Sequence, residues 1–427
     1  MRVAILTLAT ELISTDSIVS AVVQHLDMLL NAGNAVKILA DLDCFNRYEH
    51  KTFLDPRIQW VKLGDSVKDD LISWSGNLKR TGQFPRAFFQ GVDIISEMIR
   101  NNLSDVDICI LYDILQQERY LGYNLAIRKV QEALPNIRFI AFTYSPPVKS
   151  TSKTVWPFST VHSSMPNTIY VAPSRAEMLA LGEQYAISED RCRVVYTSLD
   201  ILSPLSGEVK GLANETDLLS PEILMVYPAR LTPGKKFDKV TTFAATIKNK
   251  TKSSVKAVFC DFPSTDINPE LYKALIRRLG HALNLADEDI VFTSDLGYTD
   301  GFPRSGVLDL FTLSNLFVCP SFSESFGLIA LEAASRGNFL VLNEKVPALE
   351  ELGAKLQTYF MRWDARNFGF DSKETYYPSE QNYLEEQVSK VLNLMHENPV
   401  VYSKTMIRQK YSPKWIWQNQ FAQLLTP

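Results

Sequence analysis

The chain lacks the long apolar runs and the paired cysteines that mark several protein classes. Among its 427 residues there is no run of roughly 18 apolar residues, the length that would span a membrane. The apolar start over residues 1–12 is short and meets Glu11 early, which argues against a secretory signal. The five cysteines are scattered without paired spacing, so neither a disulfide framework nor a metal-binding cysteine motif is expected. These absences predict a cytoplasmic protein.

A strong charge imbalance is also missing. The formal net charge of −4 gives no overall attraction to nucleic acid, so no nucleic-acid partner is expected. With 46% hydrophobic and 22% charged residues, the composition is that of an ordinary globular protein. A chain of 427 residues exceeds what one hydrophobic core usually organises, and two domains are therefore expected.

Short runs rich in Val, Ile and Leu alternate with amphipathic segments of helical length. This alternation predicts parallel sheets with crossover helices, built as two Rossmann-like units. The strands expected in the first half cover residues 3–9, 35–41, 58–63, 107–113, 138–143, 168–174 and 192–196. Those expected in the second half cover residues 222–227, 255–261, 289–294, 316–320, 339–343 and 357–360. Residues 202–220 read as a loop and are the expected hinge.

The most informative stretch covers residues 319–337, which read C-P-S-F-S-E-S-F-G-L-I-A-L-E-A-A-S-R-G and lead from a predicted strand into a helix. Gly327 lets a ligand approach the backbone closely, and the first N–H groups of a helix favour an anion. Glu332 lies roughly 7 Å further along the axis, within reach of a ribose whose diphosphate caps this helix. Glu324, just before the helix, would face the sugar. The alternative is an amphipathic helix with two solvated carboxylates.

A second segment, at residues 228–238, reads P-A-R-L-T-P-G-K-K-F-D and follows the predicted buried strand at 222–227. Together the two segments resemble the signatures of retaining glycosyltransferases of family 4, which have the two-domain GT-B fold. The resemblance implies that Arg230 and Lys235 bind the donor diphosphate and stabilise the charge that develops as it leaves. Lys236 stands where the family has glycine, which leaves open which neighbouring lysine reaches phosphate.

The same resemblance implies roles for further donor-site residues. Glu324 would contact the donor sugar as a catalytic residue with Arg230 and Lys235, and Glu332 would hold the ribose. The loop after the predicted strand at 289–294 is where the family usually holds the base. The other residues implied in donor binding are Ser325, Phe326, Gly327, Leu328, Leu296 and Tyr298.

The GT-B fold implies two Rossmann-like domains that face a central cleft. The expected boundaries give an acceptor-binding domain at 1–203, a nucleotide-sugar donor domain at 204–405, and a C-terminal helix at 406–427 that packs back on the first domain. The aromatic residues of that helix, Trp415 and Trp417 among them, are expected to be core residues.

The first half departs from the family after its first strand. Residues 10–17 contain no glycine, where the family usually has two near the donor and acceptor. Ser14 and Thr15 are candidate contacts to sugar or acceptor. Asp16 or Ser17 is the expected N-cap of the helix predicted over 17–30.

A family histidine in a Thr-x-His context is also absent, because the matching residues are Thr143, Tyr144 and Ser145. Either Tyr144 and Ser145 contact the sugar or acceptor instead, or His162 substitutes from another loop. A single loop histidine is more often simply exposed.

Three Asp-x-Asp triplets, at 41–43, 105–107 and 287–289, raise the alternative of a metal-dependent GT-A transferase. The 48 acidic residues produce such triplets readily by chance, and Arg230 and Lys235 already supply neutralising charge. We therefore expect no metal and no other cofactor.

A basic and aromatic stretch in the first half suggests contact with an anionic membrane. Such contact would place the protein peripherally at the inner face of the membrane, and the alternative is a partly buried surface loop. The stretch contains Lys79, Arg80 and Arg86 among Trp74, Phe84, Phe88 and Phe89.

The sequence thus predicts a retaining, metal-independent hexosyltransferase that uses a nucleotide-diphospho-sugar, with uridine favoured and UDP-glucose as an example. The acceptor would be a glycan or a lipid-linked saccharide, in polysaccharide or glycoconjugate biosynthesis. The alternatives are a nucleotide-sugar epimerase or glycosyl phosphorylase of the same fold. A further alternative is a catalytically silent GT-B module that binds a glycan or a partner.

Overall fold

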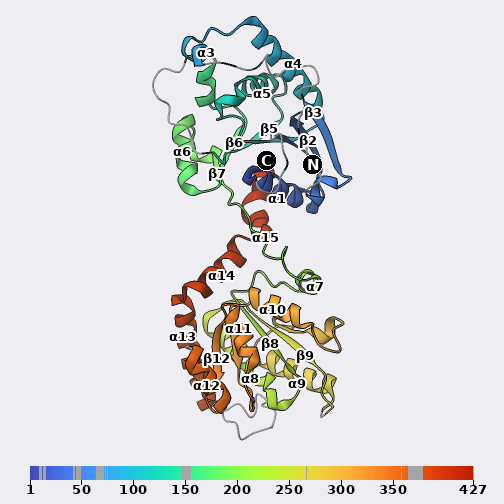
Figure 1. Ribbon diagram of the computed structural model, residues 1–427, viewed down its shortest axis with the longest axis vertical. Coiled ribbons are helices and arrows are strands. Elements are labelled where there is room, and N and C mark those ends of the chain that lie inside the picture. Colours follow the sequence, from blue (N-terminus) through green and yellow to red (C-terminus); the bar gives the residue numbers. More distant parts are fainter. Residues whose placement is uncertain are drawn as a thin grey trace. The chain divides into compact units, whose positions relative to one another are not determined.

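The computed structural model describes residues 1–8, 12, 16–41, 44, 50–63, 72, 74, 76–145, 155–265, 267–356, 358–363 and 378–426. These residues form two compact units (Figure 1). Unit 1 comprises Met1–Ser198 and Pro413–Pro427, and unit 2 comprises Leu199–Ser412. The chain therefore passes between the units twice, after Ser198 and after Ser412, where the sequence placed boundaries at 203/204 and 405/406.

Unit 1 contains a seven-stranded parallel sheet of order β3-β2-β1-β4-β5-β6-β7. Its strands are β1 (Arg2–Thr7), β2 (Ala35–Asp41), β3 (Ile58–Leu63), β4 (Ile108–Tyr112), β5 (Arg138–Phe142), β6 (Thr168–Ala172) and β7 (Cys192–Val194). Its helices before the C-terminal segment are α1 (Ser17–Asn31), α3 (Gly76–Thr81), α4 (Arg86–Leu103), α5 (Leu121–Ala133) and α6 (Arg175–Tyr185), with short 3-10 turns between elements.

Both faces of this sheet are buried, as a parallel sheet with crossover helices requires. Successive β1 residues alternate between the two cores: Ala4 and Leu6 join one, and Val3 and Ile5 join the other. Helix α1 begins after Asp16, whose carboxylate accepts the N–H groups of the first turn, at 2.7 Å from the nearest. The predicted N-cap is thereby confirmed.

Unit 2 contains a six-stranded parallel sheet of order β10-β9-β8-β11-β12-β13. Its strands are β8 (Ile223–Arg230), β9 (Val255–Phe262), β10 (Ile290–Phe292), β11 (Leu316–Cys319), β12 (Phe339–Asn343) and β13 (Tyr359–Met361). Its helices are α7 (Gly207–Glu215), α8 (Phe237–Thr251), α9 (Pro269–Ala282), α10 (Arg304–Leu313), α11 (Leu328–Ser335), α12 (Pro347–Leu356), α13 (Pro378–Glu397) and α14 (Pro399–Lys410).

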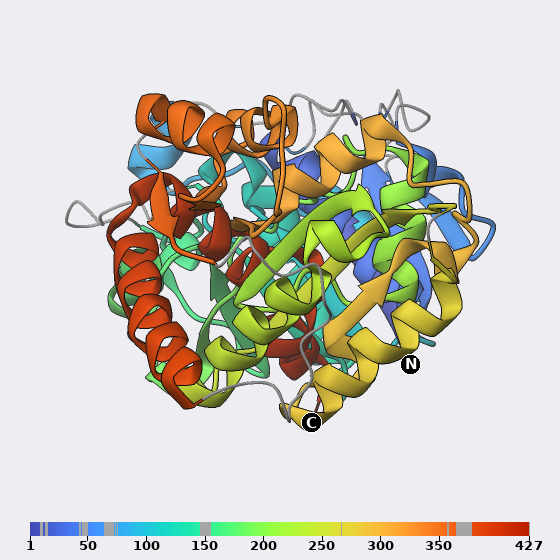
Figure 2. The same ribbon diagram turned by 90° about the horizontal axis from the view of Figure 1, so that it is seen from below.

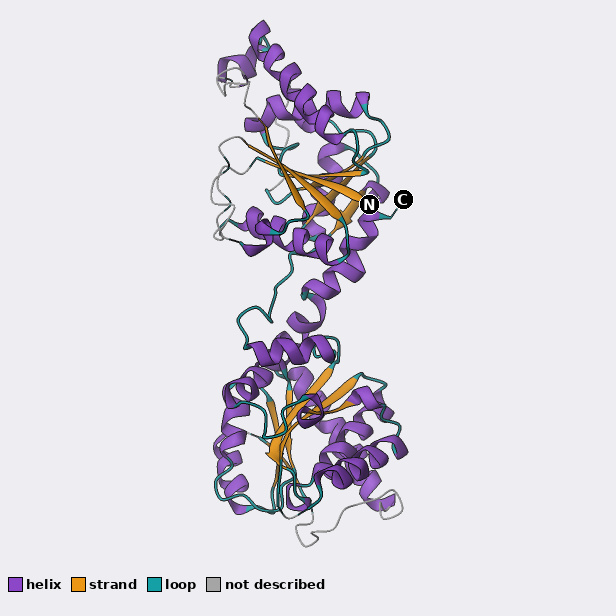
Figure 3. Ribbon diagram, turned by 90° about the vertical axis from the view of Figure 1, so that its right-hand side faces the viewer, coloured by secondary structure: helices purple, strands orange, loops and turns teal. Residues whose placement is uncertain are grey.

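The two sheets confirm the predicted class of parallel α/β units. Figure 2 views α8 and α9 (yellow-green to gold) in front of the strands of unit 2, and Figure 3 shows helices on both sides of each sheet. The predicted strands at 35–41, 58–63 and 339–343 match the observed bounds, and residue 357 lies outside the described residues. None of the helices in the described part of the chain is long and apolar enough to cross a membrane.

The predicted loop at 202–220 is wrong in its centre, where α7 forms. Val209 and Leu212, three residues apart, are fully buried in the core of unit 2. Their burial on one helical face outweighs the low helix propensity of Gly207 and Gly211. The segment therefore belongs to unit 2 as a packed helix.

The C-terminal segment packs within unit 1 as α15 (Pro413–Ile416), a π-helical turn (Trp417–Phe421) and α16 (Ala422–Leu425). Ile416, Phe421 and Leu424 are buried in one core of the sheet, and Trp415 and Trp417 lie partly buried against it. This segment supplies part of the core of unit 1 from the far end of the chain.

Candidate functional site

The candidate residues of unit 2 gather at the carboxyl ends of β8 and β11, which are neighbours in the sheet. Arg230 ends β8, and β11 ends at Cys319 before the loop that carries Glu324. The two loops are joined directly, because the N–H of Phe322 donates to the carbonyl of Gly234 at 2.9 Å. Parallel sheets bind ligands at this edge, beside a point where the strand order reverses.

Lys235 and Glu324 form an ion pair across these two loops. The Lys235 Nζ lies 2.5 Å from Glu324 Oε1, and the two side chains are 26% and 17% exposed. The buried hydroxyl of Tyr227 donates to the Lys235 carbonyl at 2.6 Å, which fixes the backbone from inside. Burial raises the pKa of Tyr227 well above its usual range, so it remains a donor.

The neighbouring Lys236 occupies a different position. It is buried and adopts a φ of +54°, the left-handed region that favours glycine. This backbone conformation gives a physical reason for the glycine of the family pattern at this place. Of the two lysines, Lys235 is the one that faces Glu324.

Arg230, the last residue of β8, is exposed to solvent. Its guanidinium is exposed and has no hydrogen-bond or ion-pair partner within the part of the chain that the structure describes. The end of β8 is held by the Leu231 N–H, which donates to the Phe262 carbonyl at 2.9 Å. The position is therefore fixed while the cation stays available to an anion.

Helix α11 begins at Leu328, directly after Gly327. Gly327 has a φ of +85°, the left-handed region that favours glycine, and a Cβ there would lie 2.8 Å from Leu349 Cδ2, so that side chain would have to shift. No side chain caps the first N–H groups of this helix. Ser325, Phe326 and Leu328 are exposed around them. This arrangement suits a bound phosphate.

Glu332 lies on α11 and is held by a residue that the sequence analysis missed. Its carboxylate Oε1 forms an ion pair with the Nη2 of Arg304, the first residue of α10. The two residues are 28 positions apart, and no motif marks Arg304. Only the packing of α10 beside α11 brings the pair together.

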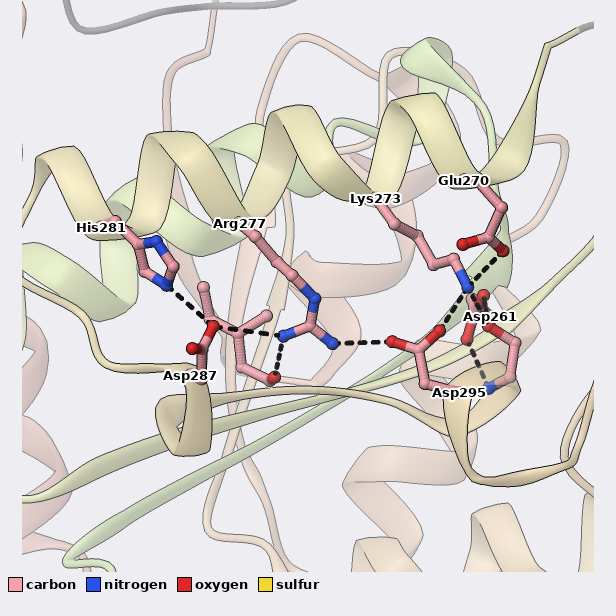
Figure 4. Close-up of polar contacts among 9 residues, drawn as sticks. Asp261, Glu270, Lys273, Arg277, His281, Asp287 and Asp295 are labelled. Carbon is pink, nitrogen blue, oxygen red and sulfur yellow. Dashed lines mark hydrogen bonds and ion pairs between the residues drawn. The ribbon is translucent and has the colours of Figure 1, made fainter.

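The loop with Leu296 and Tyr298 is held in place by hydrogen bonds and ion pairs with charged side chains of β9 and α9. Asp261, at the end of β9, accepts the N–H and hydroxyl of Ser294 at 3.1 and 2.7 Å. Burial raises the pKa of this carboxyl. Asp295 is held by Lys273 and Arg277 of α9, the latter at 2.7 Å (Figure 4). Sequence alone gave no sign of this network.

Two residues after Asp295, the loop turns at Gly297, which has a φ of +93°. The ring of Tyr298 then packs on Phe302, with their centroids 4.6 Å apart. Leu296 is partly buried against the core of unit 2.

In unit 1, Tyr144 and Ser145 follow β5 and are organised by Asp113, which the sequence analysis did not single out. Asp113 is buried, follows β4 and has a φ of +55°. Its carboxylate accepts the N–H groups of Tyr144 and Ser145 at 2.7 and 3.1 Å, and the Ser145 hydroxyl at 2.6 Å. Burial raises the pKa of the Tyr144 phenol above its usual range.

The other candidates of unit 1 are not joined to this cluster. His162 ends a 3-10 turn (Phe158–His162), and its buried Nδ1 has no hydrogen-bond partner within the described residues. No contact in that part of the chain links it to Tyr144 or Ser145. Ser14 and Thr15 lie outside the described residues.

The acidic triplets in the described part of the chain are engaged by cations or backbone. Asp105 pairs with Lys37 at 2.8 Å, and Asp107 accepts the N–H of Arg2 at 2.8 Å. Asp287 meets His281 at 2.8 Å. Among the residues that the structure describes, no group of His, Cys, Asp and Glu is arranged to hold a metal ion.

The basic and aromatic stretch is largely packed against its own unit. Phe88 is buried, and Lys79 pairs with Glu118 at 2.6 Å. Trp156, which stacks on Phe89, is the exposed aromatic of this region, at 58%.

The fold and these contacts define an α/β protein whose candidate residues gather at one edge of its second parallel sheet. Comparison with known proteins finds similarity to one family over part of the chain. Residues 213–358, all within unit 2, match the model of the family described as "Glycosyl transferases group 1".

One curated relative is the D-inositol 3-phosphate glycosyltransferase of Nocardia farcinica, which is 25% identical over 174 residues. That match spans 39% of this chain and 35% of the relative, about a third of the relative's length.

Solved structures align along nearly the whole chain at low similarity. The HepE protein of Anabaena, in complex with UDP and glucose, is 12% identical over 100% of this chain and 99% of its own, with a TM-score of 0.38. A glycosyltransferase of Rickettsia africae is 13% identical over 98% and 96%, with a TM-score of 0.34. The fold follows from the two parallel sheets described above.

Proposed function

We propose that this chain is a retaining glycosyltransferase that moves a hexose from a nucleotide-diphospho-sugar, most simply a UDP-sugar such as UDP-glucose, to a glycan or lipid-linked saccharide. The observation that carries the proposal is the 2.5 Å pairing of Lys235 with Glu324 at the sheet edge where β8 ends in the exposed Arg230. The tie between Phe322 and Gly234 brings the two signature loops together at one sheet edge. The family match over residues 213–358 supports the same site.

In this proposal, Arg230 and Lys235 stabilise the negative charge on the departing diphosphate. A planar guanidinium and a compact ammonium, held on fixed loops, act without reorganisation when the charge develops. The open N–H groups of α11 add to the same oxygens. These groups supply the positive charge that a metal would otherwise provide, and we propose that no metal or other cofactor is needed.

In the same proposal, Glu324 opposes the positive charge that develops at the anomeric carbon of the donor sugar. Its partner Lys235 would keep this carboxylate oriented before the donor binds. Because the sugar keeps its configuration and no enzymatic nucleophile is assigned, the acceptor would attack from the face that the diphosphate leaves. A leaving phosphate oxygen would then accept the proton of the acceptor hydroxyl.

Glu332 would accept hydrogen bonds from the ribose, and the loop with Leu296 and Tyr298 would hold the base. The resemblance to family 4 favours uridine. Tyr144 and Ser145, held by Asp113, are the proposed sugar or acceptor contacts of unit 1. Contact with the inner face of a membrane belongs to the same proposal, because a lipid-linked acceptor would lie there.

A panel of UDP, GDP, ADP and TDP, each with and without EDTA, tests the donor site by thermal shift. A nucleotide at 100 times its dissociation constant should stabilise its unit by about 2.7 kcal/mol, which raises the melting temperature visibly. We expect UDP to stabilise the protein equally with and without EDTA. No shift with any nucleotide would contradict a donor site, and a shift abolished by EDTA would contradict metal independence.

Slow hydrolysis of UDP-glucose then separates an enzyme from a silent binding module. We expect Glu324→Ala to reduce hydrolysis by about 100-fold, because it removes the charge that opposes the developing cation. Glu350→Ala is the matched control, since Glu350 is exposed on α12 with no side-chain partner within the described residues. Hydrolysis that is equal in both variants would contradict the role of Glu324.

A further inference from the structure

The carboxylate of Glu332 is held on one side only. Arg304 Nη2 reaches Oε1, whereas Oε2 accepts no hydrogen bond from any residue that the structure describes. The Glu332 side chain is 13% exposed, and that of Arg304 is 71% exposed. One oxygen of a largely covered carboxylate is thus occupied by a cation, and the other is left for a ligand.

The contact between Arg304 and Glu332 depends on how α10 and α11 are joined near their C-terminal ends. The amide of Asn338 donates to the carbonyl of Phe311, near the end of α10, at 2.8 Å, and to that of Ala333, near the end of α11, at 3.0 Å. A buried side chain therefore sets the spacing between the two helices. Groups on elements held in this way are better positioned than groups on free loops.

The first turn of α10 is also packed against the loop that we assign to the base. A Cβ on Gly306 would lie 2.5 Å from Phe302, so the absence of a side chain there lets the Phe302 ring lie on the helix. Phe302 in turn packs on Tyr298. Arg304 therefore starts a helix that contacts the base loop on one side and Glu332 on the other.

We propose that Arg304 is a positioning residue for the ribose of the donor. It holds Glu332 through Oε1 so that Oε2 accepts a hydrogen bond from a ribose hydroxyl. A carboxylate restrained before binding loses less side-chain entropy when the ligand arrives, and hydrogen bonds to a charged acceptor are the strong ones. This inference rests on the proposed function, since it takes Glu332 as the ribose ligand.

The specific consequence is selectivity for a ribonucleotide. Titration calorimetry with UDP, 2′-deoxy-UDP and 3′-deoxy-UDP measures this selectivity, because each analogue lacks one ribose hydroxyl. We expect the unmodified protein to prefer UDP over at least one analogue. Arg304→Ala should weaken UDP binding about fivefold and leave that analogue nearly unchanged, so that the preference shrinks.

Two further variants make this test specific. Arg278→Ala removes another arginine of unit 2, exposed on α9 and without a side-chain partner in the described part of the chain, and should leave all three affinities unchanged. In a Glu332→Gln background, Arg304→Ala should add no further loss, because the two side chains act through one contact.

Three results would overturn the inference. Equal weakening of UDP and both analogues in Arg304→Ala would place Arg304 on the phosphates or the base. Tighter UDP binding in that variant would show that the Arg304 side chain obstructs the nucleotide site. If the unmodified protein binds none of the four nucleotides of the panel, the proposed function fails, and this inference fails with it. Whether the unmodified protein binds a nucleotide therefore distinguishes failure of the proposed function from failure of this inference alone.

Discussion

At the residue scale, neighbouring side chains of the same type have different roles because their backbones differ. Lys235 ends a 3-10 turn and points to Glu324, while Lys236 takes a left-handed conformation and is buried. A charge pattern in the sequence cannot separate them, since both are lysines in the same short segment. The backbone torsions and the Tyr227 hydrogen bond decide which one faces Glu324.

A buried histidine gives unit 1 a pH dependence. Burial lowers the pKa of His25 to about 3 from its ordinary value of 6.5, and its Nδ1 lies 2.7 Å from the Tyr112 hydroxyl. Below pH 6.5, His25 is protonated in the unfolded chain but stays neutral in the folded chain. The stability that is present above pH 6.5 is therefore lost as pH falls toward 3. We expect this group to lower the free energy of unfolding by about 2 kcal/mol between pH 7 and pH 5, measured by urea unfolding, with the slope approaching about 1.4 kcal/mol per pH unit at the acid end.

Two variants test this assignment. His25→Gln should have a smaller difference in stability between pH 7 and pH 5 than the unmodified protein, whatever its absolute stability. His281→Gln, at an exposed histidine paired with Asp287, should keep the full dependence on His25. The same pH slope in His25→Gln and in the unmodified protein would contradict the role of burial. In that case an NMR titration of the His25 ring would show a pKa near its ordinary value.

At the element scale, the C-terminal segment acts as part of the core of a unit whose other elements precede residue 199. Phe421 lies on its π-helical turn, with its ring 4.6 Å from His25 and 5.9 Å from Phe142. The Tyr196 N–H donates to Gln420 Oε1 at 2.8 Å, which ties the segment to the end of β7. The segment therefore closes one face of the unit 1 sheet.

Removing this ring should destabilise unit 1 strongly. We expect Phe421→Ala to lower its free energy of unfolding by about 3–5 kcal/mol, because the lost burial is accompanied by a cavity. Gln418→Ala, at an exposed position of the same turn, should change stability by no more than about 0.5 kcal/mol. Differential scanning calorimetry measures both. Equal melting curves for the two variants would show that the segment does not contribute to the core.

At the scale of the whole molecule, the chain has two units with separate hydrophobic cores. The core of unit 2 is one cluster around β8, β9 and β11, and unit 1 has a cluster on each face of its sheet. The proposed diphosphate, ribose and base contacts all belong to unit 2, and the proposed acceptor contacts belong to unit 1. Stability and nucleotide binding should therefore be separable.

We expect two unfolding transitions in calorimetry, as is common for proteins with more than one domain. UDP should raise the transition of unit 2, because a ligand stabilises the unit that binds it. Phe421→Ala should lower the other transition and leave the shift caused by UDP in place. A single transition that responds to both changes would contradict independent cores.

Prediction from sequence succeeded best for the sheets and less well for the connections. Runs of buried residues such as those of β2 and β12 have one physical explanation, the interior of a parallel sheet. The α7 region reads as a loop because its glycines obscure two apolar residues on one face. At the candidate site, the motif residues Arg230, Glu324 and Lys235 were visible as patterns, whereas Arg304, Asp113 and Asp261 follow no local pattern.

The sequence by itself determined the class of the protein, because alternating apolar and amphipathic segments dictate parallel α/β units. It also showed that two short motifs each follow the carboxyl end of a predicted strand. The tertiary structure decided which charges meet. It paired Lys235 with Glu324 and Arg304 with Glu332, and it placed the last residues of the chain in the first core. The physical reason is that periodicity is a local property of the chain, whereas contacts between distant residues depend on how strands are ordered and how helices pack.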